Sequence, residues 1–186
     1  MVQVVNGIDE LKADHREVQA TFDRINTLAP GDPQRREVVD EFTIELVQHA
    51  MAEEMYLYPA VREHVPEGNA MADREIEDHA RVEDLLKHLE GMDADHPDFD
   101  ALVSRVIADV STHIYDEETH LFPALAAAST TAVLSELGEK IRSAKATSPT
   151  RPHPSVPGTP PMNKLLAPGL GLVDRARDLL SGRGRS

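Results

Sequence analysis

The feature that most constrains the fold is a twelve-residue motif that occurs twice, 64 positions apart and in the same register. The first copy, HAMAEEMYLYPA, begins at His49, and the second, HIYDEETHLFPA, begins at His113. In each copy a glutamate, Glu53 or Glu117, follows the histidine by four positions. On an α-helix with 3.6 residues per turn, this spacing places the imidazole and the carboxylate on one face. Each copy can therefore offer two metal ligands from one helix.

The same shift relates residues outside the motif, because it carries Asp14-His15 onto Asp78-His79 and Pro33 onto Pro97. The chain is therefore interpreted as a duplicated helical hairpin. Each half offers a lone histidine on its first helix and a His-x-x-x-Glu pair on its second. We expect these six side chains to converge between the halves as a dinuclear metal site: His15, His49, Glu53, His79, His113 and Glu117.

The spacing of apolar residues predicts an all-α fold, an up-and-down antiparallel four-helix bundle. Its helices should span about residues 8–28, 33–58, 69–90 and 99–123, and Pro59 and Pro123 should kink or end theirs. His15 fills the gap between Leu11 and Val18 in the three-and-four spacing, so it should face the core. Residues 133–141 suggest a shorter fifth helix, which we expect to lie across one end of the bundle.

Composition divides the chain into a bundle domain at residues 1–146 and a proline-rich, mostly disordered basic tail at 147–186, with a possible short helix at 170–180. The tail carries a net charge of +4 and the remainder −18. A tail of this sign is expected to be solvated, and the alternatives are that it folds back on the acidic body or touches an anionic or other protein partner.

The composition also excludes several classes of function. With no cysteine, the chain has no thiolate ligand, so a metal must bind nitrogen and oxygen. A net charge of −14 and 4% aromatic residues argue against a nucleic-acid partner. The sequence shows neither a signal-peptide pattern nor a run of about 18 apolar residues, which predicts a cytoplasmic protein without a transmembrane segment.

Charge burial separates the metal site from the main alternative. A buried carboxylate without a partner costs several kcal/mol, so Glu53 and Glu117 in a core need cations beside them. No lysine or arginine lies on the same stripes near them. In the alternative, the glutamates point outward and the histidines are ordinary hydrogen-bonded core residues, but that rotation would also expose Phe42 and Val106.

The ordered set of His15, His49-x-x-x-Glu53, His79 and His113-x-x-x-Glu117 resembles the hemerythrin-like, or HHE cation-binding, family over about residues 8–145. This resemblance implies a non-haem di-iron centre of two Fe ions joined by an oxo or hydroxo bridge. It also implies that Glu53 and Glu117 bridge the ions and that the histidines complete each one. Which two histidines bind each ion stays open.

The sequence differs from the oxygen-carrying hemerythrins at one position that bears on function. Oxygen-carrying hemerythrins have a second histidine one turn after the third-helix histidine, and here Glu83 stands there. Without this histidine, coordination positions on the metal stay open to a small ligand. Open positions favour reaction with O2, H2O2 or nitric oxide, most concretely a catalase-like or peroxidase-like defence against oxidative or nitrosative stress. The alternatives are an O2 or nitric oxide sensor or carrier, iron storage or delivery, and a structural bundle with zinc or no metal. Ligand types alone also allow manganese.

Three further positions in the motif bear on the site: Tyr56, Tyr58 and His120. Tyr56 shares the face of His49, and its repeat counterpart is His120, so either is a candidate ligand, hydrogen-bonding residue or rim residue. Tyr58 falls on the opposite face of an ideal helix and is expected to pack, unless Pro59 distorts the last turn. Glu54 and Glu118, next to the motif glutamates, should face solvent or support the histidines. His153, in the tail, should be a surface residue.

Overall fold

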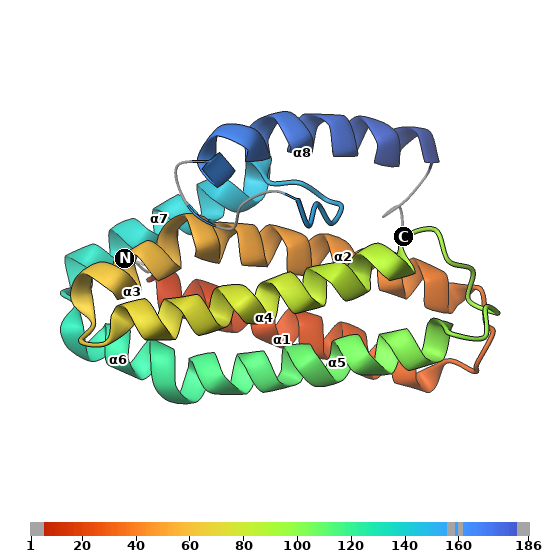
Figure 1. The fold of residues 1–186 in the computed structure, drawn as a ribbon, viewed down its shortest axis with the longest axis horizontal. Helices are drawn as coiled ribbons and strands as arrows, with labels where there is room; N and C mark the ends of the chain where they lie inside the picture. Colours follow the sequence, from red (N-terminus) through yellow and green to blue (C-terminus); the bar gives the residue numbers. More distant parts are fainter. Residues whose placement is uncertain (1–5, 156–158, 160–161, 182–186) are drawn as a thin grey trace, which may run out of the picture.

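The computed structural model describes residues 6–155, 159 and 162–181, and within these ranges the regular structure is entirely helical (Figure 1). The prediction of an all-α fold is therefore confirmed. None of the helices in these ranges combines the length and apolar character that a membrane span requires. The elements are α1 (Gly7–Thr27), α2 (Gln34–Ala52), η1 (Glu53–Leu57), α3 (Tyr58–His64), α4 (Gly68–Leu89), α5 (Phe99–Asp116), η2 (Glu117–Leu121), α6 (Phe122–Ala128), α7 (Thr131–Thr147) and α8 (Met162–Ser181), where η marks π-helical segments.

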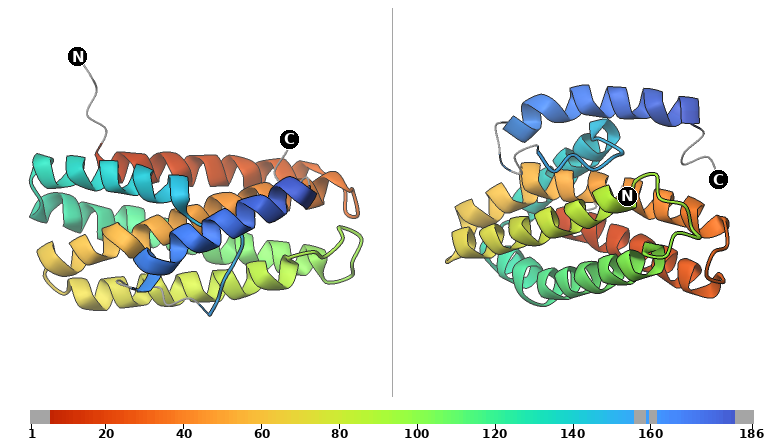
Figure 2. Two further views of the ribbon diagram at one scale, coloured as in Figure 1. Left: turned by 90° about the horizontal axis from the view of Figure 1, so that it is seen from above. Right: turned by 45° about the vertical axis from the view of Figure 1, so that its right-hand side comes forward.

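Four long rods lie side by side: α1, the continuous run α2–η1–α3, α4, and the continuous run α5–η2–α6 (Figures 1 and 2). Their apolar faces form two core clusters, one at each end of the bundle. On α1, Leu11 belongs to one cluster and Val18 to the other; on α4, Ala72 and Val82 are divided in the same way. The first-helix histidines therefore lie between the two clusters, in the middle of the bundle.

Neither proline of the motif ends its helix; the end of the helix is one of the two outcomes that the sequence predicts, a kink being the other. Each rod instead widens to a π-helix for five residues just before Pro59 or Pro123, and then continues as an α-helix. The Tyr58 amide donates to the Glu53 carbonyl and the Phe122 amide to the Glu117 carbonyl, five residues back. A proline has no N–H to donate and its ring needs room beside the preceding turn, so the wider turn accommodates it.

The fifth helix, α7, is longer than expected and does not lie across the end of the bundle. It packs lengthwise against α1 and α2 and runs parallel to α1, with Arg142 paired to Glu10 and Lys145 to Asp14 (Figure 2). The approach is close at Gly7, where a Cβ atom would lie 2.7 Å from the Leu137 side chain. A larger residue at position 7 would push α7 away.

Among the segments of the chain, the tail differs most from what the sequence predicts, which is a mostly disordered segment. Residues 148–155 lie against the bundle and α8 lies over them, about twice as long as the helix suggested for 170–180 (Figure 1). The inward stripe of α8 is small or polar: Asn163, Ala167, Gly171, Asp174 and Asp178. Four of its leucines are exposed: Leu166, Leu172, Leu179 and Leu180. Hydrogen bonding, rather than apolar burial, therefore attaches this helix, which is why hydrophobic periodicity did not predict its orientation.

Candidate metal centre

The structure brings together all six residues that the sequence singled out, in the middle of the bundle and buried. Three overlapping groups of candidate ligand atoms form, and within each group the atoms lie within 4.8 Å of one another. Two of them contain a histidine pair: His15 and His49 with both glutamates, and His79 and His113 with Glu53. The third joins His113 and Glu117 to Glu75. The histidines therefore associate by half, since each pair comes from one helical hairpin. Spacing alone had left this pairing open.

Both glutamates reach both histidine pairs. In Glu53, Oε1 lies 3.1 Å from His49 Nε2 and Oε2 lies 3.3 Å from His79 Nε2. In Glu117, Oε2 lies 3.4 Å from the Nε2 atoms of His15 and His113. Neither carboxylate has any solvent exposure. This arrangement suits carboxylates that bridge two cations.

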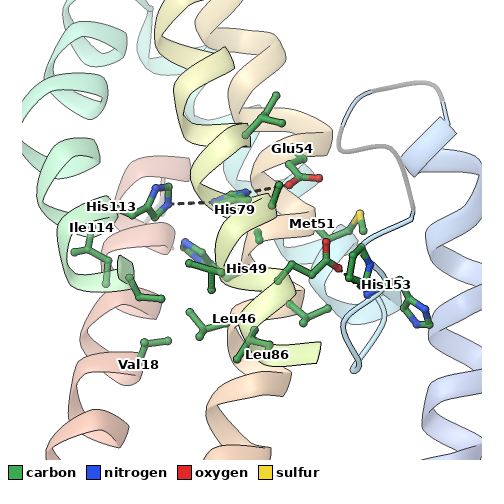
Figure 3. A pocket seen from close by; sticks show the side chains of 18 of the residues that line it. Val18, Leu46, His49, Met51, Glu54, His79, Leu86, His113, Ile114 and His153 are labelled. Atoms are coloured by element: carbon green, nitrogen blue, oxygen red, sulfur yellow. Dashed lines mark hydrogen bonds and ion pairs between the residues drawn. The ribbon is translucent and has the colours of Figure 1, made fainter. Parts of the chain in front are cut away.

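Each imidazole turns its Nε2 atom inward and its Nδ1 atom toward a carboxylate. The four Nδ1 contacts are His15 to Glu118 (2.9 Å), His79 to Glu54 (3.0 Å), His49 to Asp14 (3.1 Å) and His113 to Glu75 (2.9 Å). The first three contacts are hydrogen bonds, which fix the ring orientation, and an Nδ1–H tautomer leaves the Nε2 lone pair free for a metal. The His113–Glu75 contact has an ion-pair distance but no hydrogen-bond geometry. Figure 3 shows the Glu54 contact and the 3.1 Å approach of His79 Nε2 to His113 Nε2.

Two of these supporting acids were expected from the sequence and two were missed. Glu54 and Glu118 are repeat counterparts and do support histidines, whereas Asp14 and Glu75 do not occupy equivalent positions. The repeat counterpart of Glu75 is the core residue Leu11. A signal for Glu75 was available, because it lies three residues after Ala72 and four before His79, on the inward face of its helix.

The inward atoms are the strongest local argument for a cation. His15 Nε2, His49 Nε2, Glu53 Oε1 and Glu117 Oε2 are buried and, despite their mutual approach, none forms a hydrogen bond of acceptable geometry. Buried polar atoms without partners are costly and rare. A set of imidazole nitrogens and carboxylate oxygens fits iron, manganese or zinc. The residues present therefore fit the metal that the sequence predicted.

The electrostatics of the metal-free site point the same way. Burial opposes charge on His49, but Glu53 and Asp14 outweigh burial and raise the pKa of His49 to about 10. Burial would likewise raise the pKa of Glu53, yet the facing His49 and His79 hold the pKa of Glu53 well below its usual value. Protons thus neutralise the carboxylates when no metal is bound, and a cation must displace these protons to bind.

Tyr58 faces the centre rather than the opposite side that an ideal helix predicts, because the helix is distorted before Pro59. It is fully buried, and its hydroxyl lies 3.1 Å from His79 Nε2 and 3.1 Å from Glu117 Oε1. The π-helical turn before it supplies the extra rotation. Burial and the carboxylates of Glu117 and Glu53 raise the pKa of Tyr58 well above its usual value, so it remains a hydroxyl.

The side chains of Tyr56 and His120 lie away from the centre. Tyr56 contacts Lys164 of α8, whose ammonium lies 4.4 Å from the ring centroid. The side chain of His120 is 66% exposed and lies near Asp116 and Thr119 of its own helix. Neither belongs to the groups of candidate ligand atoms among the described residues.

A cavity of about 110 Å³ extends from the candidate ligands toward the tail (Figure 3). All four imidazoles line its inner end, and apolar residues such as Leu46, Ile76 and Val110 line its length. Glu54 and Glu83 lie on its wall, and His153 and Pro154 of the tail close its outer end. His153 is therefore half-buried against the bundle, in contrast to the expected surface position.

Proteins similar to this chain identify the family to which it belongs. The model of the hemerythrin HHE cation-binding domain matches residues 6–125, nearly two thirds of the chain, including all six candidate ligands. The chain belongs to this family. A crystal structure of a hemerythrin HHE cation-binding-domain-containing protein from Mycobacterium kansasii is similar at a TM-score of 0.67 and 25% identity, covering 76% of this chain and 86% of that one.

Two curated sequences are also similar. An uncharacterized hemerythrin-like protein of Schizosaccharomyces pombe is 26% identical over 173 residues, which cover 92% of this chain and 85% of that protein. A DNA nickase of Nostoc is 29% identical over 124 residues, 66% of this chain but 34% of that protein. Most of the nickase therefore lies outside the match, and its activity is not carried over to this hemerythrin-like chain.

Proposed function

We propose that this hemerythrin-like protein holds two iron ions, joined by an oxo or hydroxo bridge, and consumes H2O2 in a catalase-like or peroxidase-like reaction. The observation that carries the proposal is the pair of buried imidazole groups linked by two shared carboxylates, whose inward atoms lack other partners. In this assignment His15 and His49 hold one ion, His79 and His113 hold the other, and Glu53 and Glu117 bridge them. We further propose a cytoplasmic location.

Several features support reactivity with small molecules rather than a closed structural site. A bound di-iron pair would supply reversible electron transfer to O2, H2O2 or nitric oxide. Four imidazoles and two carboxylates leave octahedral ions with open positions. The apolar cavity ends at the imidazoles and is large enough for a small ligand.

The protein's own groups divide the remaining work. The four outer carboxylates orient the imidazoles, and the Tyr58 hydroxyl, which stays protonated, can donate a hydrogen bond toward the space between Glu53 and Glu117. The apolar cavity walls limit the entry of water. A small oxidant that reaches the centre would therefore meet a hydrogen-bond donor at a fixed position and few competing water molecules.

The test is metal analysis, an absorption spectrum and oxygen evolution on protein produced with sufficient iron. We expect about two irons per chain, charge-transfer bands, and O2 release on addition of H2O2. His113→Ala should abolish both iron pairing and peroxide consumption. His88→Ala is the matched control, because His88 is exposed and its Nδ1 contacts only the Asp84 carbonyl of its own helix.

Other outcomes would assign a different function. A reversible spectral change with O2 or nitric oxide, without turnover of H2O2, would replace the enzyme by a sensor or carrier. Rapid loss of iron to a chelator would indicate storage or delivery. Fewer than one metal per chain and a featureless spectrum would remove the di-iron proposal altogether.

A further inference from the structure

The outer end of the cavity is covered by the segment Thr150–Pro154, which we name the strap. The cavity passes between α2 and α4, where Ala50 and Ala80 leave room beside Glu54 and Glu83. His153 and Pro154 of the strap complete its lining. Figure 3 shows His153 on the chain segment that crosses this side of the bundle. Access to the four imidazoles by this route therefore depends on the position of the strap.

One hydrogen bond joins the strap directly to the cavity wall. The backbone N–H of His153 donates to Glu83 Oε1 at 2.7 Å. Glu83 lies four residues after His79, so one carboxylate connects the strap to the helix that supplies a candidate ligand. Its repeat counterpart in the other half is Gln19, which is exposed on α1. The connection therefore exists in one half of the bundle alone.

Buried acids of α8 hold the strap from its other side. Asp174 Oδ2 accepts from the backbone amides of Thr150 (3.2 Å) and Arg151 (3.1 Å), and from His153 Nε2 (2.9 Å). The guanidinium of Arg151 joins Asp178 of α8 (2.7 Å) to Glu90, the residue that follows α4 (2.8 Å). The polar inner face of α8 thus has a specific use, because its carboxylates bind the backbone of the strap.

We propose that the strap is a gate that decides which molecules reach the candidate metal centre, with the Glu83–His153 hydrogen bond as its latch. The closed gate suits small uncharged oxidants of the size of O2 or H2O2, and it excludes bulky organic hydroperoxides. Glu83 and His153 are then specificity-determining residues rather than catalytic ones, since they line the entry and touch no candidate ligand atom. This selectivity for oxidants rests on the proposed function, whereas the gating of the centre does not.

Two substitutions break the latch from opposite sides. Glu83→Ala removes the acceptor, and His153→Pro removes the donor N–H. His153→Ala is the matched partner of the second variant, because it loses the imidazole but keeps the N–H. Gln19→Ala controls for the loss of a polar side chain at the equivalent position of the other half. Circular dichroism and thermal melts establish that each variant is folded, and the two routes to breaking the latch guard against misfolding of one.

The first readout needs no iron and no turnover. Metal-free full-length protein is mixed with Co²⁺ in a stopped-flow instrument, and the appearance of the visible Co²⁺ bands reports entry to the centre. A hydrogen bond to a charged acceptor is strong enough that losing it should raise the open fraction, and thus the uptake rate, about tenfold. We expect this increase in Glu83→Ala and His153→Pro, a smaller one in His153→Ala, and none in Gln19→Ala.

The second readout compares H2O2 with cumene hydroperoxide on iron-loaded protein. Breaking the latch should raise kcat/KM for the bulky peroxide about tenfold relative to H2O2, with iron content unchanged. Equal Co²⁺ uptake in Glu83→Ala, His153→Pro and Gln19→Ala would overturn the gate. If the loaded wild type consumes no peroxide, the proposed function fails, but faster Co²⁺ uptake in the latch variants would still establish the gate.

Discussion

Tyr58 and Phe122 occupy equivalent positions in the two halves of the bundle, each directly after a π-helical turn. The Tyr58 hydroxyl contacts His79, whereas the Phe122 ring stacks on His15 with 5.6 Å between centroids and 10° between planes. Each side chain therefore serves the histidine of the other half. One histidine pair has a phenol hydroxyl beside it and the other has a hydrocarbon ring, so the surroundings of the two pairs differ chemically although their residue types match.

Two of the four supporting acids follow the same crossed arrangement. Glu54 of the first half orients His79 of the second, and Glu118 of the second half orients His15 of the first. Asp14 and Glu75 instead each contact a histidine of their own half. The repeated motif thus supplies matching histidines and glutamates, crossed contacts join the halves, and residues around these side chains make the surroundings of the two histidine pairs unlike.

The largest effect should follow loss of either bridging residue. Glu53→Ala and Glu117→Ala should each bind fewer than about one metal per chain, because each carboxylate contacts both histidine pairs. Metal-free Glu53→Ala should also lose about 3–5 kcal/mol of stability, since the buried charge on His49 and His79 loses this partner. Elemental analysis measures the metal content, and denaturant unfolding measures the stability. Glu139→Ala, at an exposed site, is the control. Retention of two metals in one variant would show that the halves contribute unequally.

The metal-free protein should become less stable as the pH rises from about 6.5 toward 10. The pKa of His49 rises from 6.5 to about 10 on folding, so the stabilisation is complete below 6.5 and disappears as the imidazole loses its proton. The free energy of unfolding should fall by up to about 1.4 kcal/mol per pH unit for this histidine. Metal affinity should rise over the same range because the metal displaces protons. Urea titrations across this range, with and without metal, test both signs.

Substitutions at Tyr58 and Phe122 should change the chemical difference between the surroundings of the two histidine pairs. Tyr58→Phe should cost about 1–3 kcal/mol of stability, because carboxylates that accept from the hydroxyl lose a partner. In iron-loaded protein it should also narrow the difference between the Mössbauer signals of the two ions, while Phe122→Tyr should alter the signal of the ion near His15. Tyr56→Phe lies outside the centre and should leave both signals unchanged. Identical spectra in wild type and Tyr58→Phe would remove the proposed asymmetry.

The smallest effect should come from His120. Because its side chain is largely exposed, His120→Ala should change stability by less than about 0.5 kcal/mol and leave metal content as in the wild type. Thermal melts and elemental analysis suffice as measurements. A lost metal ion in this variant would mean that the second half carries a ligand without a counterpart in the first.

The sequence predicted the helical fold and the convergence of six side chains because repetition and hydrophobic periodicity are local signals. It placed Tyr58 on the opposite face for an ideal helix of 100° per residue, with distortion before Pro59 as the exception, and the π-helical turn at residues 53–57 is that exception. Asp14 was missed because it orients a histidine of another helix, 35 positions away, and no local period reports such a contact.

The tail shows the limit of compositional reasoning. Proline and glycine content indicated no packed core, and indeed α8 turns Leu172 and Leu180 outward. Its attachment depends on Asp174 accepting backbone N–H donors of the strap, a pattern that leaves no hydrophobic signature. The fold-back of a basic tail onto an acidic body was among the alternatives, and the Arg151–Glu90 contact shows that the described part adopts it.

The π-helical turns also bear on the history of the chain. They occupy residues 53–57 and 117–121, which are equivalent after the 64-residue shift, and both precede a proline. An inserted residue inherited by both copies requires one event, whereas two separate insertions at the same place require two. If the two halves arose by duplication, one insertion before that duplication accounts for both wide turns.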